Sequence, residues 1–148
     1  MRDVEVTGFL PAGNARQVFD TLVEFERYPD LVEVVKSVEI LSPPGAVPMV
    51  SRWVVYFRNG TLSWTEADRL DRDAGTIDFV QTDGDFDEFS GRWALTHRPD
   101  GVALLFSAAF DFGVPTLAAI IDPVAERVLV ETIQLILRAL LPAVEFTP

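Results

Sequence analysis

The hydrophobic pattern of this chain changes period once, and that change constrains the fold more than any other feature. Through most of residues 3–112, apolar and polar residues alternate, which is the period of β-strands. After residues 113–115, apolar residues recur every three or four positions, which is the period of an amphipathic helix. A sheet with one apolar face must be covered, so we expect the long C-terminal helix to cover it.

The alternating part divides into seven predicted strands. They cover residues 3–10, 34–41, 49–58, 61–71, 75–82, 88–97 and 102–112. Turn signals separate them, among them a Pro-rich loop at residues 42–48 and the dipeptide Asn59-Gly60, which is typical of a tight hairpin. Because the connections among the last six strands are short, we expect these strands to form an antiparallel meander.

Two helical segments are predicted. Asn14 is a suitable N-cap for a first helix that ends near Tyr28, because Pro29 disfavours helical geometry in the residue before it. A short further turn extends through Leu31. The long second helix has an apolar stripe made of Leu117, Ile120, Ile121, Val124, Val128, Leu135 and Ile136. The whole chain, residues 1–148, is therefore expected to be a single α+β domain.

Charge and composition exclude several classes of function. The net charge is −11, from 23 acidic and 12 basic residues, and the arginines are scattered. Nucleic acids and anionic membranes repel such a chain. Without cysteine there is no disulfide or thiolate nucleophile. No charge-free apolar run approaches the roughly 20 residues of a membrane span. We expect a cytoplasmic protein with no nucleic-acid partner and no membrane span.

The faces of the predicted strands point to a cavity rather than a solid core. Strand alternation places all three tryptophans on the concave face of the sheet, at Trp53, Trp64 and Trp93. The same face carries the small residues Gly91 and Ala108 and the polar residues Glu66, Asp68 and Gln81. A solid core does not tolerate such polar groups, whereas a ligand cavity uses them. We therefore predict an internal apolar cavity.

Several local motifs carry a family resemblance. They are residues 25–31 (FERYPDL), Trp64, residues 91–93 (GRW), residues 110–115 (FDFGVP) and Asp122-Pro123. With the order of elements, they make the chain resemble the START / Bet v 1-like helix-grip (SRPBCC) superfamily. Within it, the chain looks most like the polyketide cyclase/aromatase and coenzyme-Q-binding branch. The resemblance implies a helix-grip fold, with a seven-stranded antiparallel curved sheet around a long C-terminal helix and an internal cavity.

The resemblance also implies two kinds of activity. Cyclases and aromatases of this branch fold a poly-β-ketone in the cavity and promote its condensation and dehydration, whereas other members bind isoprenoid quinones or lipids without chemistry. The family's pocket arginine on the fourth strand falls on Asp68 here, and its tyrosine after the first helix falls on Val35. Tyr28 and Trp64 match aromatic pocket positions. The oxyanion-stabilising arginine is therefore missing from its usual place.

Glu66 and Asp68 are the predicted catalytic residues. Because they are two residues apart on one strand, both point inward, with backbones about 6.5–7 Å apart. Burial and mutual repulsion raise the pKa of at least one carboxyl, which then donates a proton to a leaving hydroxyl while its ionised neighbour removes an α-proton. Alternatively, the two acids lie at the cavity mouth paired with an arginine, or a bulge turns them outward.

The remaining candidates are assigned to binding or to the surface. The predicted substrate-binding residues are Tyr28, Trp53, Trp64, Phe79, Gln81, Phe89, Trp93, Phe106 and Thr132. Thr132 lies on the inner stripe of the long helix, where it binds a ligand or bonds back to its own helix. His97, the only histidine, flanks a turn and is expected at the surface. The acidic segment 83–88 lacks the spacing of a calcium loop and is expected to be a solvated loop at the cavity entrance.

These observations favour a polyketide cyclase-like enzyme of the kind used in antibiotic biosynthesis. It acts by acid–base catalysis with no metal and no cofactor, on a hydrophobic intermediate that an acyl carrier protein could deliver. The alternative is a non-catalytic carrier of isoprenoid quinone or another lipid. A third reading, an interaction protein of the ribosome-associated toxin type, conflicts with the charge of −11. The nearly all-round apolar character of residues 128–140 would suit a homodimer contact.

Overall fold

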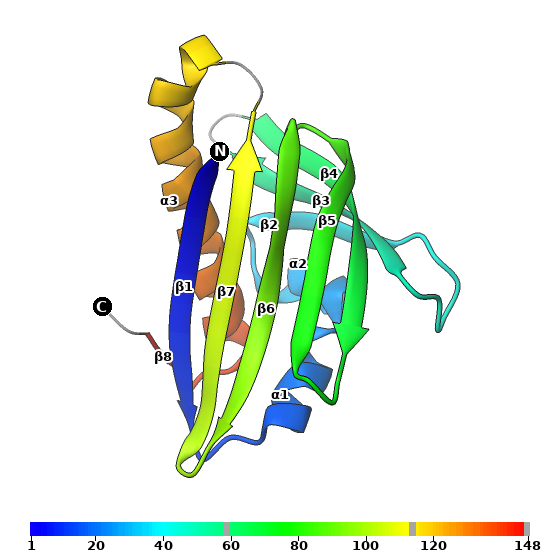
Figure 1. Cartoon of the computed structure of the whole chain (residues 1–148), viewed down its shortest axis with the longest axis vertical. Helices are drawn as coiled ribbons and strands as arrows, with labels where there is room; N and C mark the ends of the chain where they lie inside the picture. The colour runs from blue at the N-terminus through cyan, green and yellow to red at the C-terminus, as the bar shows by residue number, and fades with distance from the viewer. Residues whose placement is uncertain (58–59, 113–114, 147–148) are drawn as a thin grey trace.

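One curved antiparallel sheet dominates the computed structural model, which describes residues 1–57, 60–112 and 115–146, without the side chains of 115–122. Its eight strands lie in the order β2-β3-β4-β5-β6-β7-β1-β8 (Figure 1). Their bounds are β1 (Arg2–Pro11), β2 (Val35–Ile40), β3 (Met49–Phe57), β4 (Gly60–Asp71), β5 (Thr76–Gly84), β6 (Glu88–Arg98), β7 (Gly101–Asp111) and β8 (Glu145–Phe146).

The seven predicted strands and the helix-grip arrangement are confirmed. Each strand begins and ends within two residues of its predicted bounds, because alternation and turn residues agree along this part of the chain. The eighth strand, β8, was not predicted, since two residues carry no period. The predicted turn residue Asn59, residues Gly113 and Val114, and the side chains of Leu117, Ile120, Ile121 and Asp122 lie outside the described residues.

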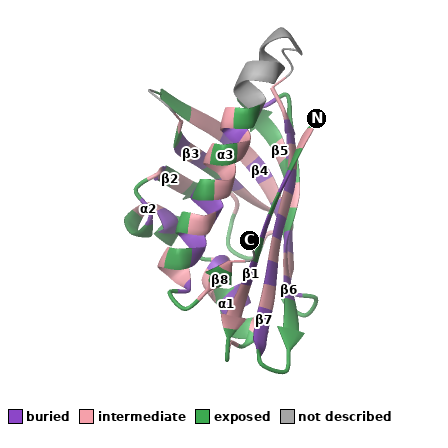
Figure 2. Ribbon diagram, turned by 90° about the vertical axis from the view of Figure 1, so that its left-hand side faces the viewer, coloured by how far each residue is buried: buried purple, intermediate pink, exposed green. Residues whose placement is uncertain are grey.

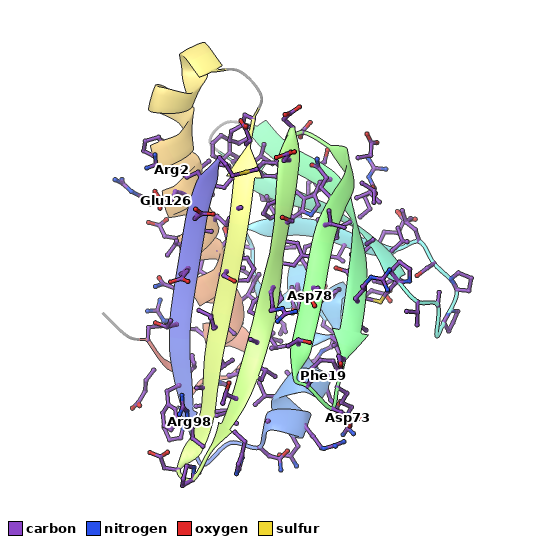
Figure 3. All side chains as sticks on the ribbon, in the orientation of Figure 1. Arg2, Phe19, Asp73, Asp78, Arg98 and Glu126 are labelled. Carbon is purple, nitrogen blue, oxygen red and sulfur yellow. The ribbon has the colours of Figure 1, made fainter. Side chains whose placement is uncertain are left out.

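The helices lie on one side of strands β1, β6 and β7 (Figure 2). They are α1 (Ala15–Leu22), the 3-10 helix η1 (Phe25–Arg27), α2 (Tyr28–Leu31) and α3 (Pro115–Leu140). The long helix α3 runs beside β1, where Arg2 meets Glu126 in an ion pair of 2.9 Å (Figure 3). This pair joins the first strand to the last helix.

The first helix is shorter than predicted. Asn14 caps it as expected, because its Oδ1 accepts hydrogen bonds from the backbone N–H groups of Arg16 (3.0 Å) and Gln17 (3.2 Å). The helix ends at Leu22, however, and Tyr28 begins α2 in helical geometry. The expectation that Pro29 would end a helix was wrong, since proline is tolerated in the first turn, where its missing N–H has no helical partner.

A register shift between β4 and β5 decides which way the predicted catalytic residues face. Thr65 pairs with Asp83, whereas the next residue, Glu66, pairs with Gln81. The extra residue, Thr82, therefore lies on β5, and β4 keeps its alternation. Consequently Glu66 and Asp68 share the inner face of β4.

Candidate functional site

A cavity of about 70 Å³ lies between the concave face of the sheet and α3. Its lining is almost entirely apolar and aromatic. It includes nine of the eleven predicted site residues, namely Tyr28, Trp53, Trp64, Glu66, Phe79, Phe89, Trp93, Phe106 and Thr132. Asp68 and Gln81 are not among the lining residues. The sequence pattern therefore located the cavity walls.

Stacked and edge-on rings make these walls stiff. The indoles of Trp53 and Trp64 lie parallel, with centroids 6.1 Å apart and planes inclined by 2°. Phe25 and Tyr28 pack edge-on against Trp53, at 5.2 and 5.5 Å. Such contacts leave the indole N–H groups free to bond with polar residues nearby.

Glu66 brings a carboxyl group into this apolar lining. Its side chain is buried, and Oε1 accepts a hydrogen bond of 2.7 Å from Nε1–H of Trp64. Within the described part of the chain no cationic side chain forms an ion pair with it. Burial raises the pKa of Glu66 well above its ordinary value, and the neighbouring Asp68 carboxyl raises it further. The bond from Trp64 only partly offsets this shift.

Asp68 is buried beside Glu66 and is held by a chain of hydrogen bonds from β3. Nε1–H of Trp53 donates to Oγ of Ser51 (2.9 Å), and the Ser51 hydroxyl donates to Oδ2 of Asp68 (2.6 Å). The other oxygen, Oδ1, is buried and has no hydrogen-bond partner among the described residues. Burial raises the pKa of Asp68, and the neighbouring Glu66 carboxyl and the hydrogen bond from Ser51 offset only part of this shift. Neither alternative from the sequence, an arginine partner or an outward bulge, describes this pair.

Asp68 faces a second space rather than the cavity. A groove of about 750 Å³, here called the η1 groove, lies between the segment that contains η1 and the Pro-rich loop. Its lining comprises Val23, Glu24, Phe25, Glu26, Arg27, Ile40, residues 42–47, Met49, Asp68 and Leu70. Phe25 lines both the η1 groove and the cavity, so it separates the two spaces.

The Gln81 side chain does not line the cavity but holds the backbone of Phe86 in place. Its Nε2 donates to the backbone oxygen of Phe86 (2.8 Å), and the Phe86 N–H donates to Oε1 of Gln81 (3.3 Å). Phe86 is buried and lines the cavity, although the acidic segment around it was expected to be solvated. Its acidic neighbours in that segment are exposed as predicted. Phe86 is the only aromatic residue in the acidic segment 83–88, and this feature could have identified it as a buried cavity residue.

The structure places four further residues that the sequence singled out. The Tyr28 hydroxyl donates a hydrogen bond to the backbone oxygen of Leu22, and burial raises the pKa of this phenol, so it stays neutral. Thr132 reaches the cavity from α3. His97 is exposed at the end of β6. Val35, at the family's tyrosine position, is buried in the cavity wall.

The described residues contain neither a metal-binding cluster nor a membrane-spanning helix. Among the residues that the structure describes, no three His, Cys, Asp or Glu side chains are grouped so as to hold a metal ion. None of the described helices is both long enough and apolar enough to cross a membrane.

Comparisons with known proteins place this architecture. The family model described as polyketide cyclase / dehydrase and lipid transport matches residues 12–135. No curated protein matches the chain. Among solved structures, the chain resembles TTHA0849 from Thermus thermophilus, with 20% identity, a TM-score of 0.84 and 96% of each chain covered.

Two other solved structures are comparably similar. The Zhui aromatase/cyclase from a Streptomyces species is 22% identical, with a TM-score of 0.79 and coverage of 95% of this chain and 92% of that one. A START superfamily protein from Mycobacterium smegmatis is 20% identical, with a TM-score of 0.78 and coverage of 95% and 97%. At these identities the likeness shows the fold.

Proposed function

Because the chain belongs to the polyketide cyclase / dehydrase and lipid transport family, we propose that it is a cyclase or dehydratase for a hydrophobic, oxygenated substrate. Family membership supports a general cyclase or ligand-binding role, and the fold alone does not choose between them. The observation that favours catalysis is Glu66, a buried carboxyl in the wall of an otherwise apolar cavity. Apolar cargo needs no such group, and burying it costs stability.

The proposed step is the dehydration of a β-hydroxy ketone. Glu66 in its protonated form donates its proton to the hydroxyl oxygen while the C–O bond breaks, and water leaves. The α-carbon proton then passes to the Glu66 carboxylate, and the C–H electron pair forms the new C=C bond. Glu66 thus ends the step protonated, as it began. The sequence suggested that one of the two carboxyls donates a proton while the other removes the α-proton. Asp68 does not line the cavity, so we assign both roles to Glu66.

Binding a substrate of this class requires the cavity to enlarge. Ligand pockets usually measure roughly 300–1,000 Å³, whereas this cavity measures about 70 Å³. The adjoining η1 groove is large enough, and Phe25 stands between the two spaces. A rotation of the Phe25 ring would open the cavity towards the groove. We propose that the substrate occupies the cavity and the space that Phe25 vacates, and that water remains in the rest of the groove beside Asp68.

The test uses the aldol adduct of benzaldehyde and acetone, a β-hydroxy ketone that dehydrates to a conjugated enone with strong ultraviolet absorbance. We expect Glu66→Gln to bind the adduct as wild type does and to lose at least about 100-fold in turnover, the effect of removing a general acid. Glu39→Gln is the matched control, since Glu39 is exposed on β2. Unchanged turnover by Glu66→Gln would show that Glu66 is not the acid.

The second candidate is a carrier of isoprenoid quinone or lipid, which the apolar lining of the cavity favours. Native mass spectrometry of protein purified from its own host distinguishes the two. A near-stoichiometric lipid or quinone supports the carrier, and an empty cavity or a cyclic oxygenated product supports the enzyme. Delivery by an acyl carrier protein, cytoplasmic location, a place in antibiotic biosynthesis and a dimer through residues 128–140 remain proposals. Leu135, exposed on α3, is the first position to mutate in testing the dimer.

A further inference from the structure

We propose that Asp68 is a proton relay for Glu66: the two carboxyl groups share one proton, and Asp68 exchanges that proton with water in the η1 groove. The relay deepens the function proposed above, in which Glu66 supplies the acid, and its test needs no substrate. Asp68 is then a positioning residue that acts through Glu66 and does not touch the ligand.

No cationic side chain among the described residues forms an ion pair with either carboxyl group. The residues around the pair are uncharged. Ser51 on β3 bonds to Asp68 and accepts a hydrogen bond from Trp53. Gln81 on β5 is opposite Glu66 in the register, and Thr132 on α3 lines the cavity with Glu66. The neighbouring Tyr28 phenol is neutral. The charged groups that line the groove with Asp68 are Glu24, Glu26 and Arg27, and Arg27 is paired with Glu24 at 3.3 Å. Two adjacent buried carboxylates without a cation cannot both stay ionised.

The oxygen of Asp68 that lacks a partner is where we place the shared proton. Oδ1 of Asp68 is buried and has no partner among the described residues, and a buried carboxylate oxygen needs a donor. A protonated Glu66 supplies that donor. Such a bond would raise the pKa of Glu66 and lower that of Asp68, in the directions found for this contact. In the resting protein Glu66 therefore donates to Asp68, and a substrate oxygen competes for the same proton.

Ser51 and Trp53 hold the Asp68 carboxylate, the proton acceptor, in place. The Ser51 hydroxyl donates to Oδ2 of Asp68 and accepts from Trp53, so it occupies one carboxylate oxygen and leaves Oδ1 for Glu66. Ser51 is fully buried, which protects this bond from competing water. Trp53 in turn lines the cavity, so the chain of bonds runs from the cavity wall to Asp68.

The proton can pass between the η1 groove and the cavity through the two carboxyl groups. Glu66 lines the cavity and Asp68 lines the η1 groove, while both side chains project from the inner face of β4. Asp68 is only 1% exposed, so it takes a proton from groove water when the groove wall opens briefly. The proton then passes to Glu66, and the reverse transfer returns it, so one proton enters for each that leaves. Glu66 can thus change its protonation state while a ligand fills the cavity.

The indole N–H groups offer separate reporters for the two carboxyls. Trp64 bonds to Glu66, Trp53 reaches Asp68 through Ser51, and Trp93, in the same wall, has no carboxyl partner in the described part of the chain. We would follow the three indole signals by ¹⁵N NMR across a pH titration of the ligand-free protein. Trp64 and Trp53 are expected to show the same pH steps, because a coupled pair has shared titration steps. Trp93 is expected to show none of them.

Two variants sharpen the test. In Asp68→Asn the Trp64 step should move to lower pH by about one unit or more, since a like charge is removed. Its signal should also split into two slowly exchanging peaks, since asparagine cannot relay the proton. In Ser51→Ala the Trp53 signal should lose its step while Trp64 keeps it. An unchanged Trp93 signal confirms that each variant is folded.

Several results would overturn the relay. They are independent titration of Trp64 and Trp53 in the wild type, an unmoved Trp64 step in Asp68→Asn, or a single fast-exchanging Trp64 peak in that variant. A different result would contradict the proposed function while leaving the relay intact. If the shared steps appear but Glu66→Gln still dehydrates the β-hydroxy ketone, the relay stands and the enzymatic role of Glu66 falls.

Discussion

Replacing Glu66 by glutamine should make the protein more stable at neutral pH and remove part of its pH dependence. Burial raises the pKa of Glu66 above the ordinary value of 4.5. Above pH 4.5 the unfolded chain loses this proton while the folded protein keeps it, so folding takes up a proton. The free energy of unfolding therefore falls as pH rises, until pH passes the folded-state pKa. Glutamine has no proton to lose and removes this contribution.

The size of the effect follows from proton linkage. Each pH unit in which only the folded state holds the proton costs about 1.4 kcal/mol of stability. Between pH 5.0 and 7.5 the wild type should lose up to about 3.4 kcal/mol relative to Glu66→Gln. Glutamine retains the shape of the side chain and can still accept the 2.7 Å bond from Trp64. The variant therefore changes the charge far more than the packing.

Urea unfolding followed by tryptophan fluorescence, at several pH values from 5.0 to 7.5, measures this difference. The quantity of interest is the free energy of unfolding of Glu66→Gln minus that of wild type, because titrating groups that do not interact with Glu66 cancel in it. Asp68 adjoins Glu66, so the difference reports the titration of the pair. Glu39→Gln, at an exposed position, should give a difference that does not change with pH. If the Glu66→Gln difference is equally flat, the carboxyl is ionised in the folded protein and the reasoning is refuted.

Three other predictions concern the scaffold. Asn14→Ala should lower the free energy of unfolding by about 0.5–2 kcal/mol in urea titrations, through loss of the N-cap. Gly91→Ala should lower the melting temperature, because its Cβ would lie 2.4 Å from the Ser107 backbone oxygen; an unchanged value would contradict the close approach of β6 and β7. Phe106→Ala should cost about 3–5 kcal/mol and tighten the binding of naphthalene-sized ligands, which calorimetry can measure.

The sheet was predictable because local and long-range signals agree in it. On β4, for example, Thr61 and Arg69 are exposed while Trp64 and Glu66 are buried, as strand alternation requires. The end of α1 was not predictable in the same way. Sequence shows the helical period around Leu22 and the proline at position 29, but the fully buried Tyr28 places a separate short helix there through tertiary packing.

The residues that line the cavity could be predicted from the faces of the strands. The sequence could not show that two residues on the same face line different spaces. Glu66 and Asp68 share one face, yet one lines the cavity and the other the η1 groove. The boundary between these spaces is Phe25, which comes from a different part of the chain. Gln81 likewise points inward but binds the backbone of Phe86. Such partners depend on packing between distant segments, which periodicity does not report.

The buried carboxyl pair links the stability of this protein to its proposed chemistry. Apolar side chains at positions 66 and 68 would avoid the cost of burying two acids. The chain instead has Glu66, a carboxyl with a raised pKa that packs against aromatic rings. It also has Asp68, a second carboxyl that Ser51 holds by a hydrogen bond. A carrier of pure hydrocarbon chains gains nothing from this arrangement, whereas an acid catalyst that must stay protonated near neutral pH requires it. The stability that Glu66→Gln regains and the turnover that it loses should therefore have the same origin, a single retained proton.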